Sequence, residues 1–527
     1  MASDSVNHIT FTEVDETNHP AATYIYSESP LPTTSQGDAS KTSGRIDVMN
    51  LSSSISSWSL ASLLNLLTDV FLPAGYPHSV SDDYAPYQIF DSLQAFSSSI
   101  AGLLSSRAVL QGVGVGNANA SPTSALLLHI LQDSSGRVAT ILFAHRVGTA
   151  LEPECKMYRL TADVFNDVAM VLDCLSPMVP AGVGRVAVLS TASVLRAMCG
   201  VAGGSSKASL SAHFSRWGNL AEVNAKDSSQ ETIISLIGML VCFVPNCLYA
   251  LQSLTKMQVG SFVVSRVTSY VATWIVLILL LTLHLALNYA AVRSVQMTSL
   301  NKQRANIVFS ALFDSDPGFT IDGFDSNYPT EGREKEIEHV QAKWCTLSPA
   351  EVAKRERIFE MDGRLKWTST AFYPPRAHKL GFCRIGISVQ EFLISSSSHM
   401  SSTSLKTYLP IFRLTSIFKE ESYILALHCV NRTWHAGIIL KNTSNIETQL
   451  KAWAHALLAA RVLSIPTSES ETQTDTAYII DVISKTLRFL NENDRCSRYI
   501  LALAHAGWDV SVGALETRSR RRVICDN

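Results

Sequence analysis

The sequence is poor in charged residues. Asp, Glu, Lys and Arg make up 17% of its 527 residues and nearly balance, with a formal net charge of −2, whereas average proteins carry about 25%. This balance argues against a large basic surface, so we expect no nucleic-acid partner. Two stretches, 232–255 and 267–292, contain no charged residue. Each exceeds the roughly 20 residues that a helix needs to cross a bilayer. We therefore predict two transmembrane helices, at 232–253 and 268–292.

The sequence also lacks metal-ligand and disulfide patterns. Its ten cysteines include no CxxC pair, so we predict free thiols, no metal site and no cofactor. No apolar segment follows Met1, and acidic residues near the start oppose a transit peptide, so we expect no secretory signal and no Arg-rich leader. Together with the predicted spans, this favours an intracellular membrane without indicating the organelle.

The pattern of the whole chain predicts a mainly α fold. We expect a membrane-embedded helical domain with at least two transmembrane helices, followed by a smaller soluble α+β domain. The boundaries that we predict are a disordered polar N-terminus at 1–57, the helical domain at 58–306, a linker at 307–335 and the α+β domain at 336–527.

Within the predicted α+β domain, alternating and amphipathic patterns mark individual elements. Residues 422–428 and 433–441 are rich in aromatic and branched side chains, and Asn431-Arg432 between them favours a hairpin. Residues 449–464 and 476–491 carry the spacing of amphipathic helices. We find no catalytic constellation in this part of the sequence.

The first candidate site is a row of ionisable side chains on a predicted helix at 152–174. Arg159, Asp163 and Asp167 recur every four residues and so share one stripe. The simpler interpretation is a solvated face with helix-stabilising ion pairs. The sharper one is a polar seam in a membrane bundle, where ionisable groups mark a ligand or ion path. In the second span, His284 and Asn288 are expected to hydrogen-bond to the first span, which we favour over a metal or proton-relay role for a lone histidine.

The second candidate site is a near miss to a phosphate-binding loop. Gly203, Gly204, Ser205, Ser206 and Lys207 follow one another, but a Walker loop needs Gly-Lys-Ser/Thr in direct succession. The segment excludes nucleotide hydrolysis by that motif. It leaves two interpretations, a cradle for a small phosphate and a flexible turn whose lysine lies at a lipid headgroup, and we favour the turn.

A series of motifs in fixed order resembles the root UV-B-sensitive (RUS) family. The series covers roughly 58–305. The resemblance implies roles in development, light response and vitamin B6 homeostasis, with no established reaction. It also implies members that act with one another or with other proteins. The segments that carry it include FLPAGYPHSVSDDYAPYQIFDSLQAFSSSIAGLLSS, LEPECKMYRLTADVFNDVAMVLDCLSP and LRAMCGVAGGSSKASLSAHF.

Three functions follow from these observations. The first is a non-catalytic integral membrane protein with a role in vitamin B6 homeostasis, whose partners are the lipid bilayer and other RUS-type proteins or a second copy of itself. The second is a membrane carrier or binder of a small phosphorylated metabolite such as a B6 vitamer, held by the two candidate sites. The third and least favoured is a pyridoxal-phosphate enzyme acting through Lys207, because no acidic partner for the ring nitrogen is evident.

Overall fold

The protein is mainly helical, with strands at its N-terminus and in its C-terminal part. A computed structural model describes residues 8–14, 20–30, 42–50, 68, 70–113, 122–251, 269–319, 344–360, 362–369, 376–394, 410–465, 475–517 and 521–524. Its contacts divide the chain into two compact units. Unit 1 comprises residues 1–100 and 210–280, and unit 2 comprises residues 101–209 and 281–527.

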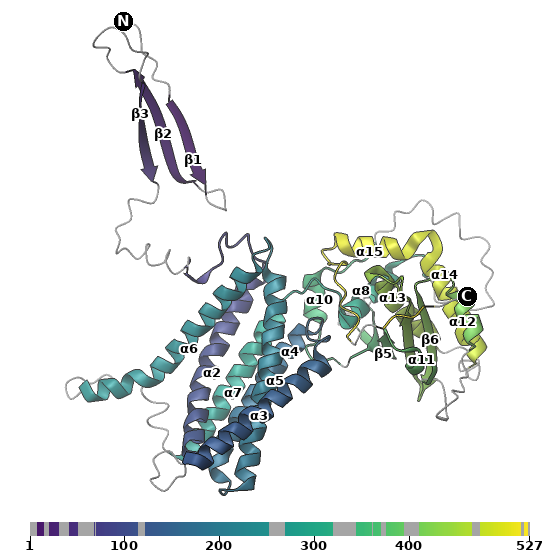
Figure 1. Ribbon diagram of the computed structural model, residues 1–527. Coiled ribbons are helices and arrows are strands. Elements are labelled where there is room, and N and C mark those ends of the chain that lie inside the picture. Colours follow the sequence, from purple (N-terminus) through teal and green to yellow (C-terminus); the bar gives the residue numbers. More distant parts are fainter. Residues whose placement is uncertain are drawn as a thin grey trace. The chain divides into compact units, whose positions relative to one another are not determined.

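Unit 1 begins with a three-stranded antiparallel sheet in the order β1-β2-β3 (Figure 1). The strands are β1 (His8–Val14), β2 (Pro20–Pro30) and β3 (Thr42–Asn50). This corrects the predicted disorder for residues 8–14, 20–30 and 42–50, because alternating Thr, Tyr, Ile and Phe residues favour strand pairing even in a polar segment. Ile9 and Phe11 remain 55% and 58% exposed, so backbone pairing rather than a core holds these strands together.

The helices of unit 1 pack through aromatic and charged pairs. Tyr84 and Tyr87 pack their rings against Phe214, with centroids 5.5 and 5.1 Å apart. Beside them His213 Nε2 lies 2.9 Å from Asp83 Oδ2, and both side chains are buried. The helical segments of this unit come from α2 (Tyr84–Val113), α5 (Val183–Phe214), α6 (Leu220–Leu251) and α7 (Tyr270–Ser294).

The described residues of the two predicted spans fall on α6 and α7. The second span, predicted at 268–292, coincides closely with α7, a 25-residue helix long and apolar enough to cross a membrane. Residues 232–251 of the first span form the C-terminal part of α6, but the side chains from 241 onward lie outside the described residues, so that span stays a prediction. Among the described residues, the second helix long and apolar enough to cross a membrane is α5.

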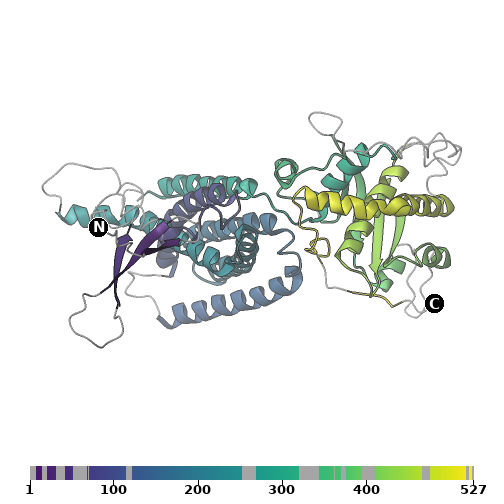
Figure 2. The same cartoon turned by 90° about the horizontal axis from the view of Figure 1, so that it is seen from above.

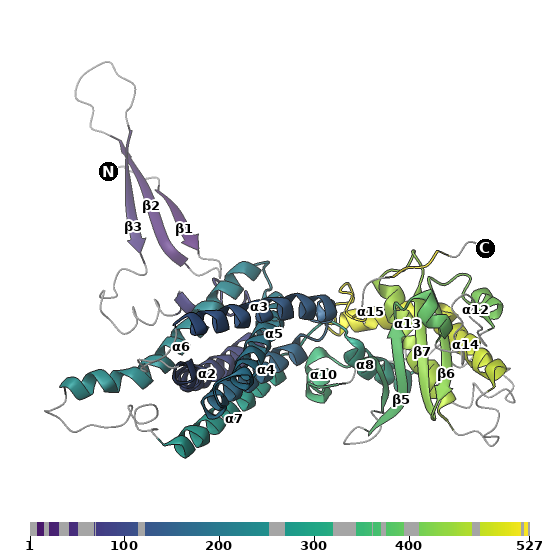
Figure 3. The ribbon, with the colours of Figure 1, turned by 60° about the horizontal axis from the view of Figure 1, so that its bottom comes forward.

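Unit 2 contains a helical part and an α+β part. The helical part consists of α3 (Pro122–Val147), α4 (Cys155–Leu175), the following 3₁₀ turn Ser176–Met178 and segments of α2, α5 and α7. In the α+β part, β4, β5, β7 and β6 form one sheet in that order, with β5 and β7 parallel and the other neighbours antiparallel (Figure 3). The strands are β4 (Arg364–Ser369), β5 (Arg376–Ile385), β6 (Tyr423–Val430) and β7 (Thr433–Leu440).

The predicted hairpin and amphipathic helices are present in the α+β part. Asn431 and Arg432 have φ values of 49° and 59° at the β6–β7 turn, the backbone region that two-residue hairpin turns use. α13 packs against all four strands, and the yellow C-terminal helices lie beside the green sheet (Figure 2). The helices are α10 (Pro349–Arg355), α11 (Val389–Ile394), α12 (Ile411–Ile417), α13 (Ile446–Leu463), α14 (Thr476–Asn491) and α15 (Arg495–His505).

The predicted linker at 307–335 is wrong in its first part. Residues Lys302–Ser315 form helix α8, capped by Asn301, whose side chain accepts a hydrogen bond from the Arg304 backbone. Its apolar residues, including Phe309 and Phe313, are fully buried in the core of the α+β part. The helix forms because those residues pack against β4 and α13. Residues 320–335 of the predicted linker lie outside the described residues.

Candidate functional site

Helix α7 leaves several large apolar side chains exposed and buries two polar ones. Ile275 and Leu279 are 64% and 67% exposed, whereas His284 and Asn288 are 0% exposed, on a buried side that also includes Leu281. In a water-soluble protein the large apolar side chains are the ones that are normally buried. The buried side of α7 therefore combines apolar residues with a polar site.

The polar residues of α7 meet three ionisable residues of α4. His284 Nδ1 lies 2.7 Å from Asp167 Oδ1, and His284 Nε2 lies 3.6 Å from Asp163 Oδ2. Asn288 donates a hydrogen bond to Asp163 Oδ2, and Arg159 Nη1 donates to Asp163 Oδ1 at 3.2 Å. None of the five residues is more than 8% exposed. We call them the α4–α7 cluster.

The cluster has unused hydrogen-bond acceptors. Asp167 Oδ2 and Asn288 Oδ1 are buried and have no hydrogen-bond partner among the described residues. A buried acceptor without a donor costs about 1–3 kcal/mol and calls for an explanation such as a water or a bound donor. The cluster is therefore built to accept a further donor or proton.

The structure agrees only in part with the polar seam that the sequence predicts. Arg159, Asp163 and Asp167 do share one buried side of α4. His284 and Asn288 hydrogen-bond to α4, whereas most of the first predicted span, to which a hydrogen bond was expected, lies outside the side chains that the structure describes. Their spacing on α7 revealed a polar face, but nothing in a single sequence indicated which helix that face meets.

The predicted phosphate cradle is not a loop. Gly203, Gly204, Ser205, Ser206 and Lys207 all lie inside α5, one continuous helix. Backbone N–H groups within a helix donate to carbonyls four residues earlier, so they are not available to surround a phosphate. Both the cradle and the alternative flexible turn are therefore wrong.

Local packing explains why the glycines do not break α5. A Cβ atom placed on Gly203 would lie 3.6 Å from the Cβ of Ala162 in α4, which is ordinary contact between closely packed helices. Ser206 donates to the Gly203 carbonyl at 3.1 Å within the same helix. Small residues thus serve helix packing in this segment.

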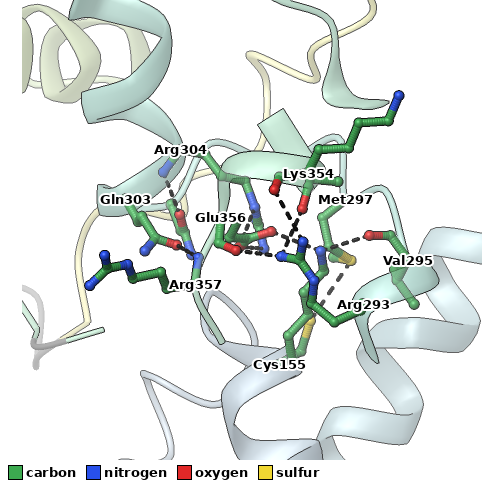
Figure 4. A network of polar contacts seen from close by, with 12 residues as sticks. Cys155, Arg293, Val295, Met297, Gln303, Arg304, Lys354, Glu356 and Arg357 are labelled. Atoms are coloured by element: carbon green, nitrogen blue, oxygen red, sulfur yellow. Dashed lines mark hydrogen bonds and ion pairs between the residues drawn. The ribbon is translucent and has the colours of Figure 1, made fainter. Parts of the chain in front are cut away.

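A second buried network lies at the N-terminal end of α4. The carboxylate of Glu356 is held between two cations, with Lys156 Nζ 2.8 Å from Oε2 and Arg304 Nη2 2.8 Å from Oε1 (Figure 4). Burial alone would raise the pKa of Glu356, but the charges of Arg304 and Lys156 outweigh burial and hold that pKa below its ordinary value. The side chains of all three are at most 5% exposed. We call them the junction triad.

Further contacts surround the junction triad. Arg293 donates to the carbonyl oxygens of Ala353 and Lys354, each at 3.1 Å, and so satisfies the end of α10 (Figure 4). Burial raises the pKa of Glu154, two residues before Lys156, to about 7. Sequence reasoning missed the triad because Lys156 and Glu356 lie 200 residues apart. The one available signal was the density of charge at the start of the α4 segment.

The fold and the site define a class of protein before any comparison is made. It is a mainly helical chain with two helices of membrane-spanning length and composition, a polar cluster buried among its helices and an attached α+β part. Its sequence matches the family described as a vitamin B6 photo-protection and homoeostasis domain over residues 57–250 and 245–316. The chain belongs to the root UVB sensitive, or RUS, family, as its motifs predict.

Relatives differ in how much of the chain they share. RUS family member 1 of Dictyostelium discoideum is 40% identical over 245 residues, 46% of this chain and 44% of that relative. Protein root UVB sensitive 3 of Arabidopsis thaliana is 28% identical over 413 residues, 77% of this chain and 79% of that relative. The chain thus spans less than half of the first relative and about four-fifths of the second. No solved structure matches the chain.

Proposed function

We propose that this RUS protein is a non-catalytic integral membrane protein that acts in vitamin B6 homeostasis. The observation that carries the membrane part is the apolar surface of α7, where Leu279 is 67% exposed although His284 of the same helix is 0% exposed. Water would expel such apolar side chains, whereas hydrocarbon accepts them and excludes the polar ones. The B6 part rests on the family to which residues 57–316 belong.

Helix α3 supports the same environment. Leu127, Ile141 and Leu142 are 62%, 68% and 63% exposed along its length. Asp133 and Arg137 on this helix pair at 2.9 Å, which neutralises charge where it would be costly in lipid. We propose an intracellular membrane, as the sequence predicted, with the bilayer and a second RUS-type chain as partners.

Cysteine chemistry supports a non-catalytic role. Cys155 and Cys383 are fully buried, and burial raises the pKa of Cys155 to about 11 and that of Cys383 further still. Both therefore remain thiols at neutral pH, and the thiolate is the nucleophilic form. Lys207, the residue considered for a pyridoxal-phosphate enzyme, lies inside a helix of small residues.

The membrane part is tested by alkaline extraction of the full chain. We expect the chain to stay in the membrane pellet at pH 11 and to dissolve in mild detergent. Release into the aqueous fraction would contradict the proposal. The B6 part is tested in a host that lacks its own RUS protein, by measuring B6 vitamers with and without this chain. Unchanged vitamer levels, or chemical conversion of a vitamer by the purified chain, would contradict it.

The unused acceptors of the α4–α7 cluster favour a second candidate, a carrier or binder of a phosphorylated B6 vitamer. Arg159 supplies the cation and Asp167 Oδ2 the open acceptor. A ligand that binds only the native state raises stability by about 2.7 kcal/mol at a hundredfold excess over its Kd. A thermal scan with each vitamer tests this, with Asp167→Asn as the variant that should lose the shift and Glu152→Gln as the exposed control. No shift with any vitamer would remove this candidate.

A further inference from the structure

The imidazole of His284 faces a carboxylate on each side. Its Nδ1 lies 2.7 Å from Asp167 Oδ1 and its Nε2 lies 3.6 Å from Asp163 Oδ2. A neutral imidazole carries one N–H group and offers a lone pair on the other nitrogen, whereas an imidazolium carries an N–H on both. With a neutral ring, one carboxylate would face a lone pair. The geometry therefore matches the charged form of the ring.

The charge of the α4–α7 cluster leads to the same form. Arg159 contributes one positive charge, and Asp163 and Asp167 contribute two negative charges. With a neutral His284 the buried cluster carries a net charge of −1, and with one added proton it is neutral. A buried uncompensated charge is costly, so the native cluster has reason to bind exactly one proton.

We propose that the α4–α7 cluster is a proton-binding site, in which His284 takes up one exchangeable proton from water and shares it between Asp163 and Asp167. Binding a proton needs no cavity, so the buried position of the ring is no obstacle. The proposal concerns the cluster alone and does not depend on whether the chain binds a B6 vitamer. The sequence analysis disfavoured a proton-relay role for His284 because it treated the residue as a lone histidine. In the structure, His284 lies between two carboxylates.

The charged and titratable groups that face His284, among the described residues, come from two helices. From α4 they are Arg159, Asp163 and Asp167, and from α5 Cys199 lies within electrostatic reach of the same three side chains. Arg196 of α5 pairs with Asp173, six residues beyond Asp167 on α4. The acids adjacent to the ring are thus Asp163 and Asp167.

Proton binding also has a mechanical consequence. When the proton leaves, the cluster regains a net negative charge, and the attraction between His284 and the carboxylates of Asp163 and Asp167 is weakened. Asp167 Oδ2 and Asn288 Oδ1, the two open acceptors, are the atoms that an incoming hydronium or water meets. Loss of the proton therefore loosens the contact between α4 and α7, and uptake restores it.

The proposal is tested on the full chain in detergent with ¹⁵N-labelled histidine. We expect an imidazolium signal at pH 7 that disappears on raising the pH and is absent from His284→Gln. The matched control is His455→Gln, because His455 is also fully buried but its pKa is lowered by burial to about 3. The control should keep the imidazolium signal. An unchanged imidazolium signal in His284→Gln would overturn the proposal.

Two further measurements keep the test decisive. Asp167→Asn retains the shape of the side chain, and we expect it to weaken proton binding at least tenfold. A neighbouring carboxylate commonly changes the pKa of a titrating group by about 1–3. This variant decides the matter if His284→Gln does not fold, and an unaltered titration in it would refute the proposal. Sodium at constant pH should leave the signal unchanged, whereas displacement by sodium would show a metal-cation site instead.

Discussion

Helix α13 buries its large apolar side chains, whereas helix α7 leaves several of its own exposed. In α13, Trp453, Leu457 and Leu458 are 0% exposed and belong to one large apolar core. In α7, Ile275 and Leu279 are 64% and 67% exposed. The comparison teaches that two helices of one chain present different surfaces to their surroundings.

The buried histidines of the two regions show the same contrast. His455 in α13 lies 3.0 Å from the Tyr423 hydroxyl and 3.0 Å from the Thr486 hydroxyl. Burial lowers the pKa of His455 to about 3, so the ring stays neutral. His284 in α7 lies between two carboxylates instead. The α+β part thus buries a neutral polar network, and the helical domain buries a charged one.

The largest expected effect tests the buried charge that accompanies the helical domain. We expect Glu356→Ala to lower the free energy of unfolding by about 3–5 kcal/mol, because it leaves Lys156 and Arg304 buried without their counterion. Chemical denaturation of the full chain in detergent measures this. The control is Glu391→Ala, which removes an exposed pair with Arg384 and should cost at most about 1 kcal/mol. Equal losses would contradict the assignment.

The apolar core of the α+β part gives the next effect. We expect Leu457→Ala to cost about 2–5 kcal/mol, because it removes buried side-chain volume and leaves a cavity. Phe412→Ala is the matched change at a 93% exposed position and should alter stability by no more than about 0.5 kcal/mol. The same denaturation experiment compares the two, and similar losses would show that the core is not where the structure places it.

A charge on the exposed side of α7 tests the comparison directly. An arginine at the centre of a membrane helix costs about 2.5–3.5 kcal/mol of insertion free energy. We therefore expect Leu279→Arg to reduce the carbonate-resistant fraction of the chain. Val389→Arg, at a 42% exposed position in the α+β part, should leave that fraction unchanged. Equal retention of both variants would argue that α7 does not face lipid.

The last expected effect is a pH dependence at Glu154. Its pKa is raised to about 7 from an ordinary value of 4.5, so the folded chain keeps a proton that the unfolded chain releases. Stability from this group is therefore full below about pH 4.5 and is lost as pH rises to about 7. Glu154→Gln should flatten that part of the thermal-midpoint profile. Glu152→Gln, at an exposed position, should follow the wild type, and a profile unchanged in Glu154→Gln would contradict the assignment.

Local patterns predicted the elements whose signals are local. The β6–β7 hairpin and α14 lie where alternation and amphipathic spacing placed them, because turn chemistry and periodicity act over a few residues. The N-terminal strands were missed because a polar composition outweighed an alternating pattern. The loop or turn predicted at 203–207 rested on the low helix propensity of Gly203 and Gly204, whereas both glycines lie inside α5.

The candidate site was predictable on each helix separately. The spacing of Arg159, Asp163 and Asp167 and that of His284 and Asn288 each indicated a polar face. Their meeting depends on which helices are neighbours, and a single sequence does not specify that. For the same reason the sequence analysis did not predict the junction triad, which joins residues up to 200 positions apart.

Helix α8 makes the family boundary a poor place to divide the chain. The family match ends at residue 316, yet α8, at 302–315, contributes Val308, Phe309, Leu312 and Phe313 to the core of the α+β part. A fragment ending at 316 would present these side chains to solvent, and a fragment beginning there would lack one wall of its core. Evolutionary module and folding unit therefore have different limits in this protein.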